Sequence, residues 1–546
     1  MYIVDHILVP YVLSNKFYIF VYLIISIIVY GIGSIFIPQT ITEFINATNK
    51  KELFGKNILK TIQSGSMMGI LYLLGLLFTI YVCIHLLKEY IENDILLKIA
   101  TYTKKEVIKK IFNKYTNNYK EIPESEVSWI IQDTYGTTRS LMRYFIIHVI
   151  PCFIIFFILS IYFFISDKTI GLMFITQFVL LNSLIYFFHN RIFESYHISD
   201  TKTINNNITI GDKIKNLMNI IFDNYIENEL ITLMKNENEL LNYMNICYYT
   251  HNKISFILNG LSYFILFIIL YKLLIYKDKK VISSLLIMLL LYKGIQDKFL
   301  NDTLYQYLSI SKILKINDFI EDITKNDSCI PIKQFKSIKL ENVSYRYDDK
   351  SDYILRNLNI YFKPENINVM MGKSGSGKTT IMKLIIKMYN PTKGEIYLDE
   401  TNSKDICQKD IRNNIYYVNQ RTILFDESVL YNLQYGNHTT KAVIVELLTK
   451  YDLLDYYKTL QNGIETSSGV NGSNLSLGMQ KIIMVVRGIL KPNKGIIIFD
   501  EPLTSLDKET REKIVQLIVN ETKGKTVIII SHDPEILPYA DHIVRL

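Results

Sequence analysis

The segment from residue 372 to residue 380 reads GKSGSGKTT and has the residue types that bind phosphate. It follows an apolar stretch expected to form a strand, residues 367–371, and precedes a stretch expected to form a helix, residues 380–389. Glycines let backbone N–H groups surround phosphate oxygens, and the N-terminus of the following helix favours their negative charge. We expect Lys378 to reach the β- and γ-phosphates of ATP and the Thr379 hydroxyl to bind Mg²⁺. This context predicts a Walker A motif.

An apolar strand that ends in two acids supplies the second part of the predicted site. Residues 496–501 read IIIFDE, so a buried parallel strand would end at Asp500 and Glu501. Asp500 is predicted to be a partner of Mg²⁺, and Glu501 is placed to polarise an attacking water as a general base. The loop residues predicted to contact ATP form one continuous run: Gly372, Lys373, Ser374, Gly375, Ser376, Gly377, Lys378, Thr379 and Thr380.

Further motifs follow in an order that is specific to one family. Residues 340–546 resemble the nucleotide-binding domain of an ABC transporter. The resemblance implies that Tyr347 stacks on adenine, and that Gln420 contacts Mg²⁺ and takes part in catalysis. It also implies that His532 is a catalytic residue that touches the γ-phosphate. Asp507, in the sequence Ser-Leu-Asp, matches the D-loop and is expected near ATP.

The signature sequence of the family is altered in this chain. The family has Leu-Ser-Gly-Gly-Gln, whereas residues 475–479 read LSLGM, with Leu477 and Met479 replacing a glycine and the glutamine. The resemblance implies that Ser476 and Gly478 bind the γ-phosphate of the ATP held by an opposite subunit. A leucine with positive φ would be strained, so we expect the helix that follows to start differently from that of relatives.

Long apolar runs occupy the N-terminal half of the chain. A helix needs about 20 apolar residues to cross the hydrocarbon core of a membrane. Buried helices of a soluble protein would be amphipathic, whereas five of these runs are apolar all round and carry no charged side chain: residues 17–42, 61–87, 144–166, 169–190 and 254–271. We therefore predict an integral, multi-pass membrane protein with six spans, near residues 17–42, 61–87, 144–166, 169–190, 254–275 and 280–300.

The sixth predicted span is the least apolar. Residues 281–292 carry no charge, but Lys293, Asp297 and Lys298 follow them. Lys293 and Asp297 are four residues apart and can pair on one face of a helix. Such charges either face the interior of the bundle or a water-filled cavity, or already lie at the inner membrane surface. The sequence leaves both interpretations open.

The composition changes from about residue 336, after which no further spanning run occurs, and we place the domain boundary near residue 325. We predict a multidomain protein with an all-α six-helix transmembrane domain over residues 1–320 and a linker over residues 321–336. An α/β P-loop ATPase domain with a helical subdomain is predicted over residues 337–546 and is expected on the cytosolic side of the membrane. The five cysteines are scattered and odd in number, so we interpret all of them as buried apolar residues or spectators.

The balance of charged residues does not suggest a nucleic-acid-binding protein. There are 60 Lys and Arg residues and 52 Asp and Glu residues, which gives a net charge of +8. Proteins that bind nucleic acid concentrate basic charge in a patch, so this balance gives no case for nucleic acid as a partner. The cytosolic face of a membrane protein requires only a modest excess of basic residues such as this one.

The whole chain resembles an exporter-type ABC half-transporter, in which six spans precede one ATPase domain. The resemblance implies ATP-driven export by a dimer of half-transporters. The second half-transporter is identical or related to this chain, and ATP is hydrolysed at the interface between the two. Membrane lipid and a small-molecule, lipid or peptide cargo are the other expected partners. Short transverse helices are expected near residues 117–126 and 222–228, at the tips of long polar connections. Two alternatives stay open: a heterodimer with one weakened site, and a nucleotide-gated channel or sensor.

Overall fold

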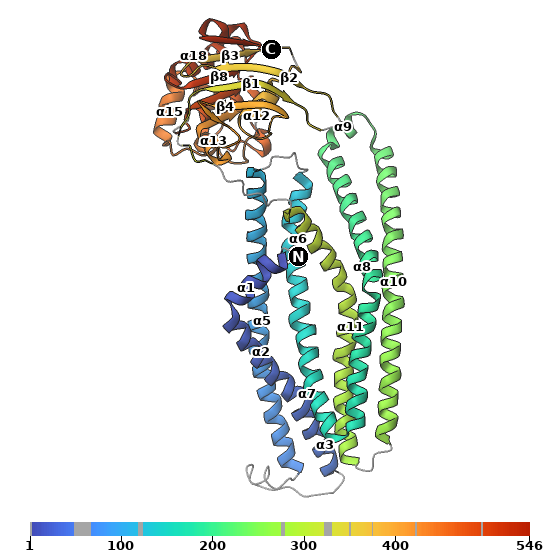
Figure 1. Ribbon diagram of the computed structural model, residues 1–546. Helices are drawn as coiled ribbons and strands as arrows, with labels where there is room; N and C mark the ends of the chain where they lie inside the picture. Colours follow the sequence, from blue (N-terminus) through green and yellow to red (C-terminus); the bar gives the residue numbers. More distant parts are fainter. Residues whose placement is uncertain are drawn as a thin grey trace. The chain divides into compact units, whose positions relative to one another are not determined.

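The computed structural model describes residues 3–48, 67–117, 124–274, 279–321, 330–332, 334–348, 351–373, 375–420, 423–492 and 495–546. The chain divides into two units (Figure 1). The helical unit holds Met1–Phe112 and Glu121–Thr324, and the α/β unit holds Asn113–Lys120 and Lys325–Leu546. Each unit is described by itself.

The helical unit is built from long helices that run side by side (Figure 1). An aspartate marks one boundary between them, because Asp167 caps the next helix by accepting hydrogen bonds from the N–H groups of Thr169 and Ile170. The helices are α1 (Val9–Ser14), α2 (Lys16–Gly31), α3 (Ile37–Thr48), α5 (Met67–Asn117), α6 (Glu124–Tyr144), α7 (Ile150–Ser166), α8 (Lys168–Lys215), α9 (Leu217–Phe222), α10 (Ile226–Leu274) and α11 (Lys279–Glu321). Three π-helical segments are η1 (Val4–Leu8), η2 (Ile32–Phe36) and η3 (Phe145–Val149).

Five stretches of helix in the described residues are long and apolar enough to cross a membrane. Their most apolar windows have mean hydropathies of 1.8 to 2.6. The stretches are Lys16–Phe44, Met68–Asn113, Glu126–Ser166, Lys168–Lys215 and Ile226–Leu273. Each of the first five predicted spans overlaps one of them, although residues 61–66 and 275 lie outside the described residues.

The sixth predicted span lies within α11, which is not among those five stretches. The physical reason is the charge carried by Lys293, Asp297 and Lys298 in this part of the helix. The predicted pair is confirmed, because the Lys293 ammonium contacts the Asp297 carboxylate and also donates to Ser262 Oγ, at 2.9 Å. Lys293 is only 5% exposed, so this charge faces the interior of the helical unit.

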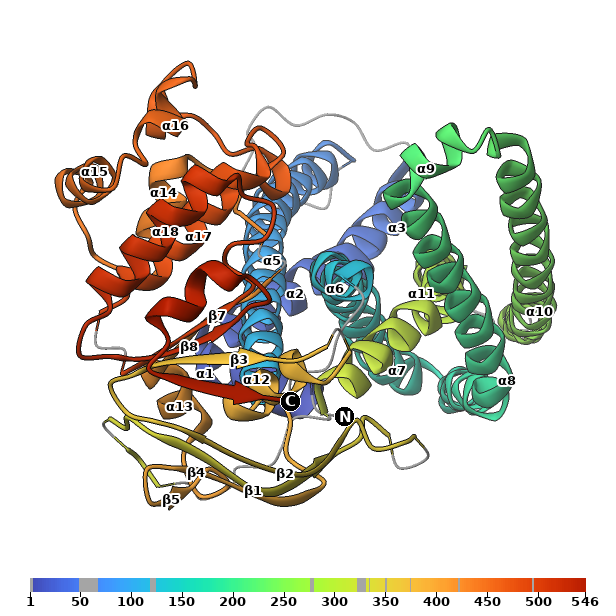
Figure 2. The ribbon, with the colours of Figure 1, turned by 90° about the horizontal axis from the view of Figure 1, so that it is seen from above.

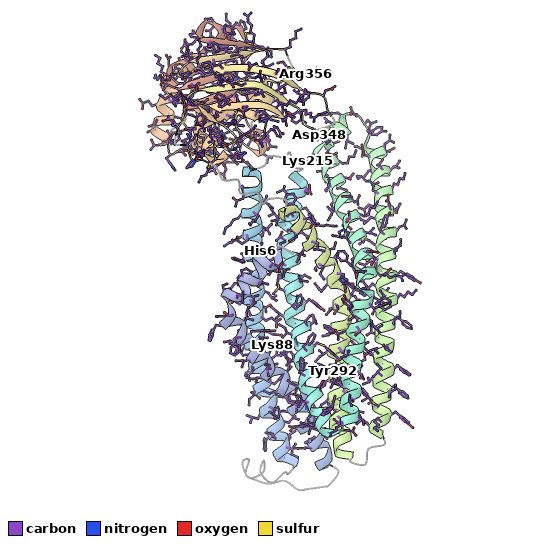
Figure 3. The ribbon with its side chains drawn as sticks, viewed as in Figure 1. His6, Lys88, Lys215, Tyr292, Asp348 and Arg356 are labelled. Atoms are coloured by element: carbon purple, nitrogen blue, oxygen red, sulfur yellow. The ribbon has the colours of Figure 1, made fainter. Side chains whose placement is uncertain are left out.

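Other polar side chains in this unit also join neighbouring helices. Gln177 of α8 donates to Ser262 Oγ of α10, at 3.2 Å, and to Gln296 Oε1 of α11, at 3.3 Å. Lys88 of α5, labelled in Figure 3, is buried and pairs with Glu92 at 3.1 Å. Buried charges in these helices are thus compensated by partners, as a low-dielectric interior requires.

The predicted transverse helices have different outcomes. Most of residues 117–126 lie outside the described residues. The short helix between α8 and α10 is α9, which ends at Phe222, so the element predicted over residues 222–228 lies earlier in the chain. Residues 223–225 form a turn instead, because the cap of α9 is followed by Asn224 with a φ of +50°.

The α/β unit contains two sheets (Figure 2). The first is antiparallel, with the order β2-β1-β4-β5, and the second is parallel, with the order β6-β7-β8-β3-β9. β7 and β8 are buried over their full lengths, as central strands of a parallel sheet require. The strands are β1 (Ile338–Tyr345), β2 (Leu355–Phe362), β3 (Ile367–Met371), β4 (Lys393–Leu398), β5 (Thr401–Asn402), β6 (Ile415–Val418), β7 (Ile496–Asp500), β8 (Thr526–Ile530) and β9 (His542–Arg545).

Helices surround these sheets and form two apolar cores with them. One core joins the parallel sheet to α14, α15, α17 and α18, and the other joins the antiparallel sheet and α12 to further residues of the parallel sheet. The helices are α12 (Lys378–Ile385), α13 (Gln408–Asn414), α14 (Val429–Gln434), α15 (Lys441–Lys450), α16 (Asp455–Lys458), α17 (Leu477–Ile489) and α18 (Lys508–Glu521). Three 3₁₀ segments are η4 (Gly463–Glu465), η5 (Val470–Gly472) and η6 (Pro534–Tyr539).

The cysteines differ from one another in their state. Cys83 is exposed, and Cys152 and Cys247 are buried; all three are free thiols. Cys407 is disulfide-bonded, so the interpretation of this residue as a spectator is wrong. Spacing along the chain did not reveal it, because folding brings distant cysteines together.

Candidate functional site

The carboxyl ends of neighbouring parallel strands bring the predicted catalytic residues to one edge of the sheet. β3 leads into the phosphate loop, β6 into Gln420, β7 into Glu501 and β8 into His532. Ligands of open parallel sheets bind at this edge. A cavity of about 350 Å³ lies here and is lined by Ile354, Gly375, Gly377, Lys378, Thr379, Thr380, Gln420, Asp500, Glu501 and His532.

The phosphate loop has the backbone that its glycines were expected to allow. Gly375 and Gly377 have φ angles of +81° and +89°, and a Cβ on Gly377 would lie 2.5 Å from Leu355 Cδ2. Ser374 lies outside the described residues. The loop therefore needs glycine at Gly377 for both its conformation and its packing.

Polar groups of this loop are suited to an anion. Lys378 Nζ donates to the carbonyl oxygens of Gly372 and Lys373, at 2.8 and 3.0 Å. Ser376 Oγ is buried and has no hydrogen-bond partner within the described residues. A phosphate would supply an acceptor for Ser376 and an opposite charge for Lys378. The loop thus fits a nucleotide phosphate.

Oxygen atoms from α12, β6 and β7 lie together beside the loop. Thr379 Oγ1 donates to Asp500 Oδ2, at 3.3 Å, and Tyr417 OH donates to the same oxygen, at 2.7 Å. Hydroxyl and carboxylate oxygens, completed by phosphate oxygens, are the ligands that Mg²⁺ prefers. Burial, and then the charge of Asp500, raise the pKa of Tyr417 well above its ordinary value. These residues fit Mg²⁺, and Tyr417 is a contact that the motifs did not predict.

The Glu501 carboxylate is held between two side chains. His532 Nε2 lies 3.5 Å from Glu501 Oε1, and Thr504 Oγ1 donates to Glu501 Oε2, at 3.1 Å. Glu501 also has a φ of +53°, in the left-handed region that costs energy for residues other than glycine. The N–H of Glu501 donates to Ile530 O, at 2.9 Å, and this bond fixes the strained backbone. A carboxylate fixed in this way can accept a proton from a water in the cavity.

The predicted adenine contact lies next to the loop. Tyr347 is 49% exposed, and its hydroxyl lies 3.3 Å from Thr380 Oγ1. The rings of Tyr345 and Tyr389 pack edge-on against it, with centroid distances of 5.2 and 5.6 Å. Burial raises the pKa of Tyr345 to about 12, so this supporting phenol is neutral at physiological pH. The Tyr347 ring is thus supported by its neighbours and remains accessible for stacking.

The altered signature is accommodated without backbone strain. Ser476 is the N-cap of α17 and accepts a hydrogen bond from the Met479 N–H, at 3.3 Å. Leu477 is the first helical residue, is 63% exposed and has no positive φ. Gln480 Nε2 donates to the carbonyl oxygens of Gly472 and Leu475 and so closes the loop before the helix. The positive φ that would have strained a leucine is therefore not required.

Seven of the predicted ATP-binding residues that the structure describes do not line the 350 Å³ cavity. Tyr347, Gly372, Lys373 and Ser376 belong to the phosphate loop or lie next to it, whereas Ser476, Gly478 and Asp507 belong to other elements. Ser476 and Gly478 lie at the N-terminus of α17. Asp507 is the N-cap of α18, where it accepts hydrogen bonds from the Thr510 hydroxyl, at 2.6 Å, and from the Thr510 N–H, at 2.9 Å. These two bonds lower the pKa of Asp507. Within a single chain, Asp507 therefore acts as a helix cap.

A lysine that the motifs did not predict lies close to the site. Lys481 of α17 donates hydrogen bonds to the backbone carbonyls of Gln420 and Glu501. Burial lowers the pKa of its ammonium, and the charges of Asp500 and Glu501 oppose that change. The available signal was a lysine directly before the apolar run of residues 482–486, which places a charge at the start of the buried part of the helix.

Comparisons with known proteins agree with this geometry. Residues 355–504 match the family model of the ABC transporter. The ATP-dependent lipid A-core flippase of Syntrophus aciditrophicus (strain SB) is 31% identical over 268 residues, which are 48% of this chain and 44% of the flippase. The ABC transporter ATM1 of Plasmodium falciparum (isolate 3D7) is 35% identical over 210 residues, which are 38% of this chain and 20% of that protein. The chain thus matches less than half the length of these relatives.

A solved structure matches almost the whole chain. It is described as the structure of a bacterial Atm1-family ABC exporter with ATP bound, and it covers 97% of this chain and 93% of its own. The TM-score is 0.80 at 17% sequence identity, which shows the fold. The predicted fold class is confirmed: a helical unit with membrane-spanning character precedes an α/β nucleotide-binding unit.

Proposed function

We propose that this chain, which has the fold of an ABC exporter and an ABC transporter domain over residues 355–504, is a membrane-embedded half-transporter that uses ATP hydrolysis to export a cargo. One observation carries the proposal. A single cavity brings together the phosphate loop, Gln420, Asp500, Glu501 and His532, which come from four different strand ends. Such a set of a phosphate cradle, a metal carboxylate and a general base is what ATP hydrolysis requires.

Six side chains that line the cavity have roles in the proposed reaction. Lys378 exchanges the carbonyls of Gly372 and Lys373 for the β- and γ-phosphates of ATP. Thr379, Asp500 and Gln420 would hold Mg²⁺, which neutralises charge on the phosphates when it is bound. Glu501 accepts the proton of the attacking water, and His532, 3.5 Å from it, contacts the γ-phosphate.

The position of the signature residues supports hydrolysis at an interface between two subunits. Ser476 and Gly478 stand at the N-terminus of α17, a place that favours an anion, but they do not line the cavity of their own chain. In the proposed dimer they meet the γ-phosphate bound by the partner's phosphate loop. ATP then lies between Lys378 of one subunit and Ser476 of the other, with the ATPase domains on the cytosolic side.

Replacing Ser476 by Ala is expected to lower the ATPase kcat about tenfold, because the lost hydroxyl would contact the partner's γ-phosphate in the closed dimer. ATP binding to the open subunit should change less than about threefold, since Ser476 does not line that cavity. The matched control is Ser428→Ala, because Ser428 caps α14 by the same type of bond, to Tyr431 N–H at 3.0 Å. Equal loss of kcat in both variants would show that Ser476 acts only as a cap.

Replacing Tyr347 by Ala is expected to weaken MgATP binding about tenfold, because base–aromatic stacking contributes about 1–3 kcal/mol per base. Equilibrium binding to the purified chain measures this effect. Inorganic triphosphate, which has no base, should bind both forms equally. Tyr361→Ala removes an exposed tyrosine on β2 and is the control. A matching loss of triphosphate affinity would contradict the stacking role.

The proposed cargo is amphiphilic. Buried charges of the helical unit are compensated in pairs, Lys88 with Glu92 and Lys293 with Asp297, which leaves little fixed charge for an ionic cargo. The lipid A-core flippase among the relatives supports a lipid-like molecule. ATPase assays in lipid, with added lipids, peptides and thiol conjugates, test this: stimulation by amphiphiles supports the proposal, and stimulation only by anionic cargo contradicts it.

The exposed Leu477 favours one alternative arrangement. It stands at the tip of α17, where the family has a glycine, and its side chain would face the partner's nucleotide. A heterodimer, in which this signature forms the weaker of two sites, would explain the change. In that case the chain alone would hydrolyse ATP slowly, and a related subunit would restore the rate.

A further inference from the structure

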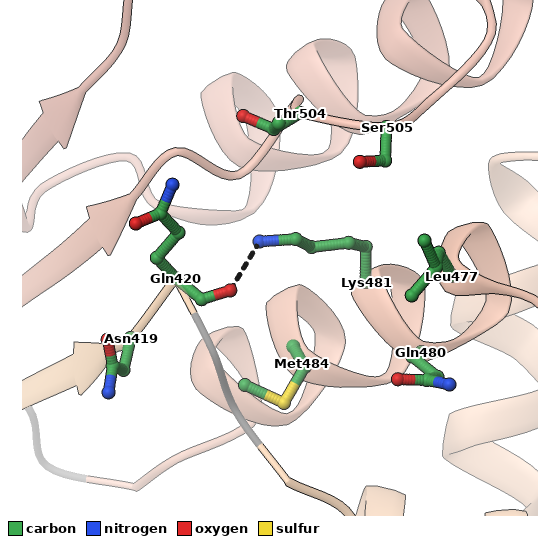
Figure 4. Close-up of a pocket in the computed structure, with 8 residues that line it drawn as sticks. All are labelled: Asn419, Gln420, Leu477, Gln480, Lys481, Met484, Thr504 and Ser505. Atoms are coloured by element: carbon green, nitrogen blue, oxygen red, sulfur yellow. Dashed lines mark hydrogen bonds between the residues drawn. The ribbon is translucent and has the colours of Figure 1, made fainter. Parts of the chain in front are cut away.

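A second cavity in the α/β unit, of about 300 Å³, is crossed by one charged side chain. Figure 4 shows Lys481 extending from α17 toward Gln420. The cavity is lined by Asn419, Gln420, Leu477, Gln480, Lys481, Met484, Thr504 and Ser505. Lys481 Nζ lies 3.2 Å from Gln420 O and 3.2 Å from Glu501 O, and it donates a hydrogen bond to each.

Both acceptors belong to residues that the proposed function places at the reacting phosphate. Gln420 follows β6, and Glu501 follows β7, so the ammonium joins the ends of two neighbouring strands. An ammonium has three donors and can bind two carbonyl oxygens at once. Hydrogen bonds from a charged donor are stronger than those between neutral groups. One side chain can therefore fix the backbone of both residues.

The backbone of Glu501 is strained, so a contact that fixes it is important. Its φ of +53° is unfavourable for a glutamate, and the next strained residue, Ser505 with a φ of +69°, lies on the same turn. The N–H of Glu501 is held by Ile530 O, and its carbonyl is held by Lys481. The direction of the carboxylate therefore depends on the lysine as well as on the sheet.

The same helix also carries the signature residues. Ser476 caps α17, and Lys481 is the fifth residue of this helix, little more than one turn away. We infer that Lys481 is a positioning residue that connects the signature end of α17 to Gln420 and Glu501 of the same subunit. This inference rests on the proposed function. Binding of the partner's nucleotide at Ser476 is thereby coupled, through α17 and Lys481, to the position of the Glu501 carboxylate in the same subunit.

Replacing Lys481 by Met tests the inference in the full chain reconstituted in lipid. We expect kcat for ATP hydrolysis to fall at least tenfold while the Kd for MgATP changes less than threefold, because Lys481 does not line the nucleotide cavity. The Hill coefficient for ATP should fall toward 1. Lys481→Arg keeps the charge and several donors, so it should recover at least a third of the wild-type kcat.

Lys491→Met is the matched control. Lys491 follows the other end of α17 and also donates to a backbone carbonyl, that of Tyr435, at 2.5 Å. This variant should keep the wild-type kcat and Hill coefficient. Lys481→Gln, which keeps a polar amide, replaces the Met variant if the latter does not fold.

Two outcomes would overturn the inference. The first is an unchanged kcat and Hill coefficient in the Met or Gln variant. The second is an Arg variant no better than Met, which would show that a charged donor at this position does not support catalysis. Failure of the proposed function is a separate result, because the wild-type chain would then show no ATPase rate for the variants to be compared with.

Discussion

The Glu501→Gln variant is expected to hydrolyse ATP about 10²- to 10⁴-fold more slowly than the wild-type chain, because a positioned general base contributes about that much. Its affinity for MgATP should stay within about threefold of wild type, since an amide fills the same space and can still accept from Thr504. The variant should therefore trap ATP. Steady-state ATPase rates and retained radiolabelled ATP measure the two effects.

A matched control for this variant is Glu509→Gln. Glu509 is an exposed residue in the first turn of α18 that pairs with Lys513 at 2.7 Å, and exposed pairs of this kind contribute little. Its kcat should equal that of the wild type. An unchanged kcat in Glu501→Gln would remove Glu501 from the catalytic machinery.

Replacing Lys378 by Met is expected to weaken MgATP binding at least about 100-fold. The methionine keeps most of the packing of a side chain that is only 8% exposed, but it removes the ammonium that would bind two phosphates. Hydrogen bonds to charged groups contribute about 1.5–3 kcal/mol each, so the loss of two accounts for this change. Equilibrium titration with MgATP measures it.

Two comparisons separate this effect from a loss of fold. Lys441→Met, which removes an exposed lysine paired with Glu465, should bind MgATP as the wild type does. The melting temperature of Lys378→Met should not fall by more than a few degrees, because the hydrogen bonds of the Lys378 ammonium to described residues go to the carbonyls of its own loop. MgATP affinity that matches wild type would contradict the predicted phosphate contact.

The sequence predicted those parts of the site that are formed by residues close together along the chain. The phosphate loop sits between β3 and α12, and Asp500 and Glu501 end β7, because glycine spacing and an apolar run ending in acids are read along the chain. Tyr417 and Lys481 could not be predicted in this way. Their contacts depend on β6 lying beside β7 and on α17 packing against both, which are properties of strand order and helix packing.

The same distinction holds in the helical unit. Five of the six predicted spans overlap apolar helices of the described residues, because an uncharged apolar run is a local property, and the pairing of Lys293 with Asp297 followed from helical spacing. Whether this pair faces the interior was not decided by the sequence. It required the neighbouring Ser262 of α10, which accepts a hydrogen bond from Lys293.

The central claim is that ATP is held between two subunits in a membrane. The most direct test is to purify the full-length Glu501→Gln chain in lipid nanodiscs, add MgATP, and measure the particle mass and the nucleotide retained per chain. We predict particles with two chains that retain ATP, and less ATP retained per chain when Ser476→Ala is added. Single chains that retain one ATP each, unaffected by Ser476→Ala, would contradict the account.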